Sequence, residues 1–150
     1  MNLRYSSQTA RRHFGFLFIA IMLLQTPAFG QQSGYDEELG QLSGELRSLL
    51  VRVERLDPHL TAMRIELQEQ LFDLSKRLHR LEEEASAANL QLMRQGSPPD
   101  KKLILASAIA KALDLSQSLA GSYIDTRMPV FWSQALAAAQ TARTLQTAQR

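Results

Sequence analysis

The histidines are the first residues to consider for chemistry, because imidazole binds metals and moves protons near neutral pH. Beyond the first thirty residues the chain has only His59 and His79, and Glu83 stands four residues after His79. That spacing places two potential ligands on one face of a helix. A zinc site needs a third and usually a fourth ligand, and no second pair with this spacing occurs. We therefore predict no metal site and interpret both histidines as surface residues.

Carboxylates and serines give no better sign of catalysis. Glu82, Glu83 and Glu84 are consecutive, so on a helix they point in different directions, whereas an acid–base pair needs two facing carboxylates. No serine lies in a G-x-S-x-G turn, and no glycine-rich phosphate loop occurs. The chain has no cysteine, which excludes thiol catalysis, disulfides and cysteine metal sites. The sequence predicts a non-enzymatic protein without a cofactor.

The segment 123–132 has the composition of a binding surface. Tyr123, Arg127, Phe131 and Trp132 surround a predicted turn. Aromatic side chains and arginine are the residue types that dominate binding hot spots. The alternative is that these side chains close one end of a helical bundle. The sequence leaves both interpretations open.

A long stripe of apolar residues runs from residue 39 to residue 92. The helices that carry it would hold any binding side chains of the chain in place. The residues of the stripe recur at intervals of three and four, which places them on one face of a helix. The first series is Leu39, Leu42, Leu46, Leu49, Val53, Leu56, Leu60, Met63 and Leu67. After Gln70 the second series is Leu71, Leu74, Leu78, Leu81, Ala85, Ala88 and Leu92. So wide a stripe favours a bundle of several helices over a two-stranded coiled coil.

Residues 31–95 are predicted to form amphipathic, coiled-coil-like helices with one interruption at Asp57-Pro58. Aspartate followed by proline is typical of a helix cap and first helical residue, which would start a second helix at Pro58. A single helix kinked at Pro58 is the alternative. One glycine and two prolines in residues 96–99 then predict a sharp turn.

Residues 100–150 are rich in alanine and leucine and are predicted to form a helical hairpin. Its first helix, residues 101–120, has a broad apolar surface and should be the most buried one. Residues 121–128 would connect it to a second helix, which Pro129 opens and which continues to about residue 146. No stretch shows a strand pattern. The sequence thus predicts an all-α helical bundle of long amphipathic helices with a C-terminal α-hairpin.

The long stripe also predicts a protein partner. It is longer than the two C-terminal helices could each cover, so part of it would remain exposed in a single chain. We expect self-association or binding to another protein through Leu67, Leu71, Leu74, Leu78 and Leu81. Leucine at both core positions does not determine the number of subunits.

Residues 1–30 have the layout of a secretory signal peptide. Three arginines precede an apolar core at residues 14–24, and small residues before Gln31 fit cleavage after Gly30. The core is shorter than the roughly 20 apolar residues that span a membrane. An uncleaved membrane anchor is the alternative. The pair Arg11-Arg12 leaves twin-arginine export open beside the general route.

The charge of the chain gives no support for nucleic-acid binding. The chain has 17 basic and 15 acidic residues, but Arg4, Arg11 and Arg12 all lie in the predicted signal. Without these three the counts are 14 and 15, so the net charge changes from +2 to −1. The basic excess therefore belongs to the export signal and implies neither a nucleic-acid partner nor, after cleavage, a membrane contact.

Together these features predict a bacterial protein that is periplasmic or secreted. Its expected role is that of a structural or assembly component of the cell envelope, which interacts with proteins through its helices. The alternative is a periplasmic chaperone or adaptor that binds client proteins in an apolar groove. The wide stripe, together with Met63 and Met93, is the reason for considering a chaperone or adaptor.

We predict that the protein in the envelope fraction begins at Gln31 or within a few residues of it, because the signal is removed during export. Intact-mass measurement of the purified protein checks this. Retention of residues 1–30 would contradict it and support the membrane anchor.

Overall fold

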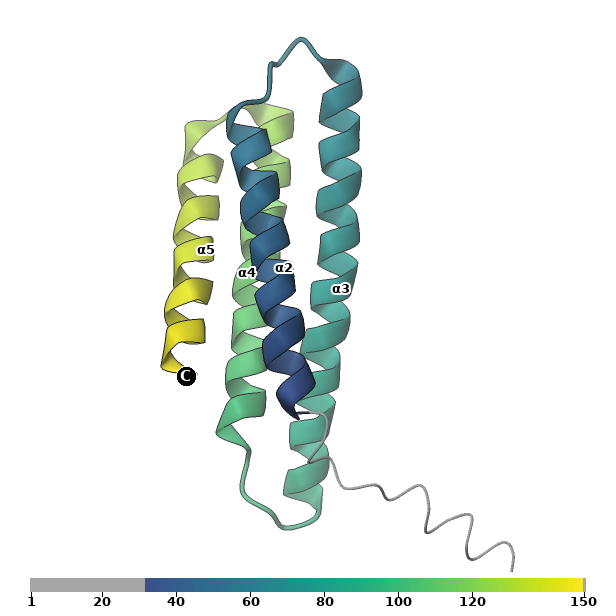
Figure 1. Cartoon of the computed structure of the whole chain (residues 1–150), viewed down its shortest axis with the longest axis vertical. Coiled ribbons are helices and arrows are strands. Elements are labelled where there is room, and N and C mark those ends of the chain that lie inside the picture. The colour runs from purple at the N-terminus through teal and green to yellow at the C-terminus, as the bar shows by residue number, and fades with distance from the viewer. Residues whose placement is uncertain (1–31, 150) are drawn as a thin grey trace, which may run out of the picture. The chain divides into compact units, whose positions relative to one another are not determined.

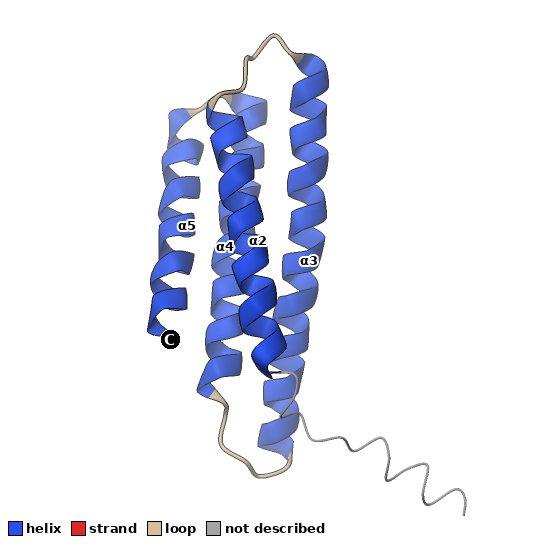
Figure 2. Ribbon diagram, viewed as in Figure 1, coloured by secondary structure: helices blue, strands red, loops and turns tan. Residues whose placement is uncertain are grey.

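Four antiparallel helices make up the part of the chain that the computed structural model describes, residues 32–149. They are α2 (Gln32–Glu54), α3 (Thr61–Arg94), α4 (Lys101–Thr126) and α5 (Pro129–Ala148). Figures 1 and 2 show them side by side in alternating directions, and these residues contain no strand. The predicted all-α helical bundle is confirmed. The predicted signal, residues 1–30, lies outside the described residues.

Helix α4 lies at the centre of the bundle and packs against α2, α3 and α5. Its side chains Ile109, Leu113 and Ile124 are between 0% and 1% exposed. Among the described helices, α4 is also the one whose length and composition would suffice to cross a membrane. The core helix of a helical bundle meets the same criteria, and 44% of the apolar window of α4 is buried inside the described bundle.

Small side chains bring α5 close to α4. Ala120 of α4 and Ala135 and Ala142 of α5 are fully buried. Ser116, also fully buried, donates a hydrogen bond from its hydroxyl to the carbonyl oxygen of Ala135 (2.7 Å). This bond satisfies a hydroxyl that would otherwise be costly to bury. The two helices therefore form a closely packed α-hairpin.

The turn between α3 and α4 follows local sequence rules. Gly96 has a φ of 77°, a left-handed conformation that glycine adopts without strain. The amide of Ser97 reaches back to the carbonyl of Leu92 (3.0 Å), as in a Schellman C-cap. Asp100 then caps α4 by accepting a hydrogen bond from the amide of Lys102 (2.8 Å).

The chain reversal between α2 and α3 differs from the prediction. Helix α3 begins at Thr61, so the prediction that Pro58 is its first residue is wrong. The carboxylate of Asp57 accepts a hydrogen bond from the amide of His59 (2.9 Å), and its carbonyl accepts one from Leu60 (3.1 Å). These bonds form a turn that needs several non-helical residues. The interruption is therefore a full reversal and not a kink.

Helix α4 is longer than predicted, because it continues to Thr126. The predicted connector at residues 121–128 is wrong, since Gly121 lies inside the helix. Burying Ile124 contributes about 1.5–3 kcal/mol, which exceeds the roughly 1 kcal/mol cost of a glycine in a helix. Arg127, with a φ of 57°, ends the helix, and Pro129 begins α5.

We expect Ile109→Asp to unfold the bundle, because it would place an unpaired charge at a fully buried position at a cost of several kcal/mol. Ile104→Asp is the matched control, since Ile104 lies on the same helix and is 47% exposed. Circular dichroism should show loss of helicity for the first variant only. An unchanged melting temperature for Ile109→Asp would contradict the central position of α4.

Candidate partner-binding groove

The five leucines predicted to bind a partner lie in the core of the bundle. Leu67, Leu71, Leu74, Leu78 and Leu81 are all between 0% and 2% exposed. Helices α2 and α4 both pack against α3 and cover this face. The expectation that it stays uncovered in a single chain is therefore wrong. A partner could contact these leucines only if the bundle opened.

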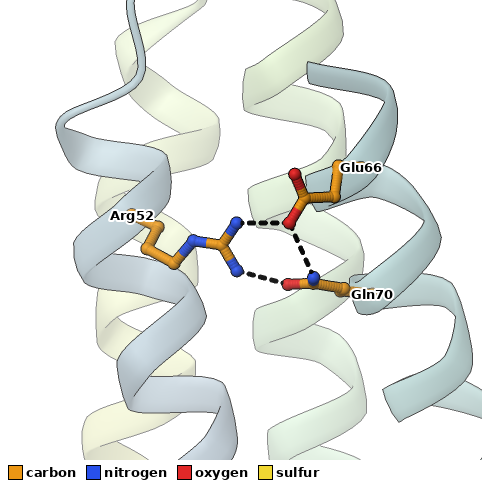
Figure 3. Close-up of polar contacts among 3 residues, drawn as sticks. All are labelled: Arg52, Glu66 and Gln70. Atoms are coloured by element: carbon orange, nitrogen blue, oxygen red, sulfur yellow. Dashed lines mark hydrogen bonds and ion pairs between the residues drawn. The ribbon is translucent and has the colours of Figure 1, made fainter. Parts of the chain in front are cut away.

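Polar contacts cross the seam between α2 and α3, which also holds a hollow of about 600 Å³ lined mostly by polar and charged side chains. Figure 3 shows Arg52 of α2 facing Glu66 and Gln70 of α3. The guanidinium donates to a carboxylate oxygen of Glu66 (2.8 Å) and to the amide oxygen of Gln70. Gln70 in turn donates to the same oxygen of Glu66 (3.0 Å). The polar residue that interrupts the apolar stripe is thus part of the contact between the two helices.

Two further ion pairs cross the same seam. Arg77 of α3 pairs with Glu45 of α2, and Arg80 pairs with Glu38 (2.7 Å). The hydrogen bond to Glu45 raises the pKa of the Arg77 guanidinium above its ordinary value. Exposed pairs of this kind contribute only about 0–1 kcal/mol each. Their main consequence is that the charges of this seam are already matched within the chain.

The seam between α2 and α5 also holds a hollow, and its lining is more apolar. These two helices make almost no close backbone contact, and a groove of about 320 Å³ lies between them. Its deep part includes Leu46 of α2 and Leu113 of α4, which are each 1% exposed. Trp132 and Leu136 of α5 line one side. Apolar side chains thus form the interior of a groove that no helix of the described bundle covers.

A second hollow of about 350 Å³ extends this groove toward the start of α2. The two hollows share Ser43 and Arg47, so they adjoin along the same seam. Gly40 and Gly44 line the second hollow, and a Cβ atom built on either would meet nothing within 4 Å. Hydrogen bonds cross this second hollow: Ser43 donates to Gln146, and Gln146 donates to the carbonyl oxygen of Leu39. The hollow is therefore partly closed, and it also contains the carboxylate of Asp36.

Two arginines flank the groove without a partner. Arg47 on α2 and Arg143 on α5 are exposed, and neither side chain forms an ion pair or hydrogen bond within the described part of the chain. Glu54 is the acidic residue that lines the first hollow, and the sequence of α5 contains no acidic residue. This hollow therefore carries a positive charge that the bundle does not use.

The aromatic segment forms one end of this region. The rings of Tyr123 and Trp132 lie 5.4 Å apart between centroids, and the guanidinium of Arg127 lies 5.5 Å from the Tyr123 ring. Such a position permits a cation–π interaction. Phe131 is half-buried and does not line the groove. Trp132 therefore both packs at the end of the bundle and reaches the groove.

The residues considered for metal or acid–base chemistry do not converge. His79 lies 3.8 Å from a carboxylate oxygen of Asp114, while Glu82 pairs with Lys111 of α4 (3.1 Å) and Glu83 is exposed. Residues 32–149 contain no group of three or more side chains that could hold a metal ion. The consecutive glutamates point apart, as their helical spacing predicts.

The groove had only a weak sequence signal. The sequence does not predict a binding role for Arg47, Arg143 or Leu136, because nothing in their spacing shows which helices face each other. The absence of acidic residues from α5 is the feature that distinguishes this side of the bundle.

Comparison with protein-family models, curated proteins and solved structures finds no match to the chain.

We predict that Arg47→Gln and Arg143→Gln change the free energy of unfolding by less than about 0.5 kcal/mol, because neither side chain takes part in folding contacts. The control is Leu46→Ala in the floor of the groove, which should cost about 2–5 kcal/mol. Urea unfolding measures all three. A loss above about 1 kcal/mol for either arginine variant would show that the arginine has a structural role.

Proposed function

We propose that this chain is an exported, non-enzymatic helical-bundle protein that acts as an interaction or assembly component of the bacterial cell envelope. The groove between α2 and α5 is the observation that carries the proposal. At its edges Val51 and Leu136 are 41% and 45% exposed, although both lie beside an apolar interior. A partner that covered the groove would remove this apolar surface from water, which favours binding.

The layout of residues 1–30 supports the export part of the proposal. Their arginines, short apolar core and small residues before Gln31 are those of a cleaved signal. After cleavage, the net charge of −1 gives the remaining chain no general attraction to nucleic acids. A protein partner in the envelope is therefore the most direct explanation for an uncovered groove.

The chaperone alternative is less well supported. It relied on Met63 and Met93 as adaptable contacts, and these residues are 41% and 52% exposed. They lie near opposite ends of α3, about 45 Å apart at 1.5 Å per residue, and neither lines the groove. Unpaired arginines beside the groove also favour a defined partner over many unrelated clients.

The test is capture of the tagged protein from the envelope of its native host after crosslinking. We expect periplasmic or secreted location and one reproducible partner in constant ratio. Val51→Glu with Leu136→Glu should abolish capture, since both changes place charge at the edges of the groove. Phe72→Glu with Leu115→Glu is the matched control, because these residues are 62% and 55% exposed and lie outside the groove.

Three results would contradict the proposal. The first is a cytoplasmic location of the mature chain. The second is a partner that both double variants retain equally. The third is capture of many unrelated proteins together with suppression of their aggregation, which would instead support the chaperone alternative.

A further inference from the structure

We propose that α2 is the element at which this bundle opens: it detaches and unfolds as one unit while α3, α4 and α5 stay folded. Its departure uncovers the part of the apolar face of α3 against which it packs. This inference concerns a conformational device and does not depend on the proposed function. It rests on the place of α2 in the chain, its packing, its polar bonds and its helix propensity.

The order of the helices lets α2 leave the bundle by movement at a single connection. Helices α2 and α5 are the first and last of the described helices, so each is joined to the others by one connection only. The connection of α2 is the turn at residues 55–60, where His59 and Leu60 donate hydrogen bonds back to Asp57. These bonds lie within the turn itself. Opening of α2 therefore does not require them to break.

Helix α2 is packed less closely than α5. Helix α4 packs tightly against both α3 and α5, and much less tightly against α2. Hollows lie along both sides of α2: those of about 320 and 350 Å³ face α5, and those of about 600 and 250 Å³ face α3. Side-chain atoms that line a hollow lack protein neighbours on one side and lose those packing contacts. The buried leucines of α2 are therefore supported less completely than the core between α4 and its other neighbours.

The hydrogen bonds that join α2 to other helices of the described bundle are exposed or partly exposed. Toward α3 they involve Arg52, Arg77 and Arg80, and toward α5 they involve Gln146 and Gln149. Water replaces such bonds at little cost when a helix leaves. Helix α5 is held differently, because a serine hydroxyl of α4 donates a fully buried hydrogen bond to its backbone.

The sequence of α2 favours unfolding once the helix has detached. Gly34, Gly40 and Gly44 all lie within its 23 residues, and glycine is the poorest helix former after proline. A Cβ atom built on any of the three would meet nothing within 4 Å, so close packing does not require glycine there. Most helical stability in proteins comes from packing. Detachment of α2 is therefore also its unfolding, which opens its amides to exchange with water.

Native-state hydrogen exchange, followed residue by residue by NMR, tests the proposal on the protein from the envelope fraction. The exchange rate of each amide is divided by its rate in an unfolded peptide. We expect the central amides of α2 to exchange together, at least a hundredfold faster on this scale than the central amides of α3, α4 and α5. The common rate would identify one cooperative opening.

Matched glycine variants test whether this opening is the unfolding of α2. Gly44→Ala should slow exchange in α2 about fivefold, because alanine favours the helix over the unfolded chain. Gly121→Ala is the control: it lies inside α4, and its Cβ atom would also meet nothing within 4 Å. This control should leave exchange in α2 unchanged, because α4 stays folded while α2 opens.

A crosslink across the α2–α3 seam should prevent the opening. The chain has no cysteine, so Glu45→Cys with Arg77→Cys creates a single thiol pair where these two side chains pair across the seam. After reaction with a short bismaleimide, exchange in α2 should fall to the level of α4. Glu82→Cys with Lys111→Cys is the control, because it replaces an ion pair between α3 and α4 (3.1 Å). Its crosslink should leave α2 exchange fast.

Three outcomes would overturn this proposal. Equal exchange in α2 and α4 would show that the bundle unfolds as one unit. Faster exchange in α5 than in α2 would identify α5 as the element that opens. Equal slowing of α2 exchange by Gly44→Ala and Gly121→Ala would show that its amides exchange through unfolding of the whole bundle.

Discussion

The contact between α4 and α5 is the constraint on which the rest of the arrangement depends. Ser116 and Ala135 join these helices through a buried hydrogen bond, and Ala120, Ala135 and Ala142 of the same two helices are fully buried. Helix α5 is therefore held against α4. Helix α2 packs against both α3 and α4 and makes almost no close backbone contact with α5.

Polar contacts hold α5 near α2 only toward one end of the seam. Gln146 accepts a hydrogen bond from Ser43 (3.4 Å) and donates one to the carbonyl oxygen of Leu39 (3.3 Å). Such partly exposed bonds contribute little net stability but fix the relative position of the two helices. Further along, the facing side chains leave an apolar space instead of closing it. The groove lies along that part of the seam, and Arg47 and Arg143 stand beside it without an ion pair within the described residues.

Much of the fold was accessible from the sequence because it rests on local rules. Gly96 and the prolines after it predict the end of α3, and Pro129 predicts the start of α5, since both residue types restrict the backbone. The helix start predicted at Pro58 is wrong because a turn stabilised by Asp57 competes with the helix start that the same residues favour. The helix end predicted at Gly121 is wrong because the burial of a later residue, Ile124, outweighs the poor helix propensity of glycine.

The sequence by itself determined that the chain is helical and which face of each helix is apolar, because periodicity fixes the direction of each side chain relative to its own axis. It could not determine which helix covers which face. Only the tertiary structure decided that Leu74 and Leu81 are covered by the same chain, and that a partly apolar groove lies between α2 and α5. The physical reason is that contacts between helices depend on the reversal at Asp57 and on the close approach of α4 and α5. Both bring together residues that are far apart in the sequence.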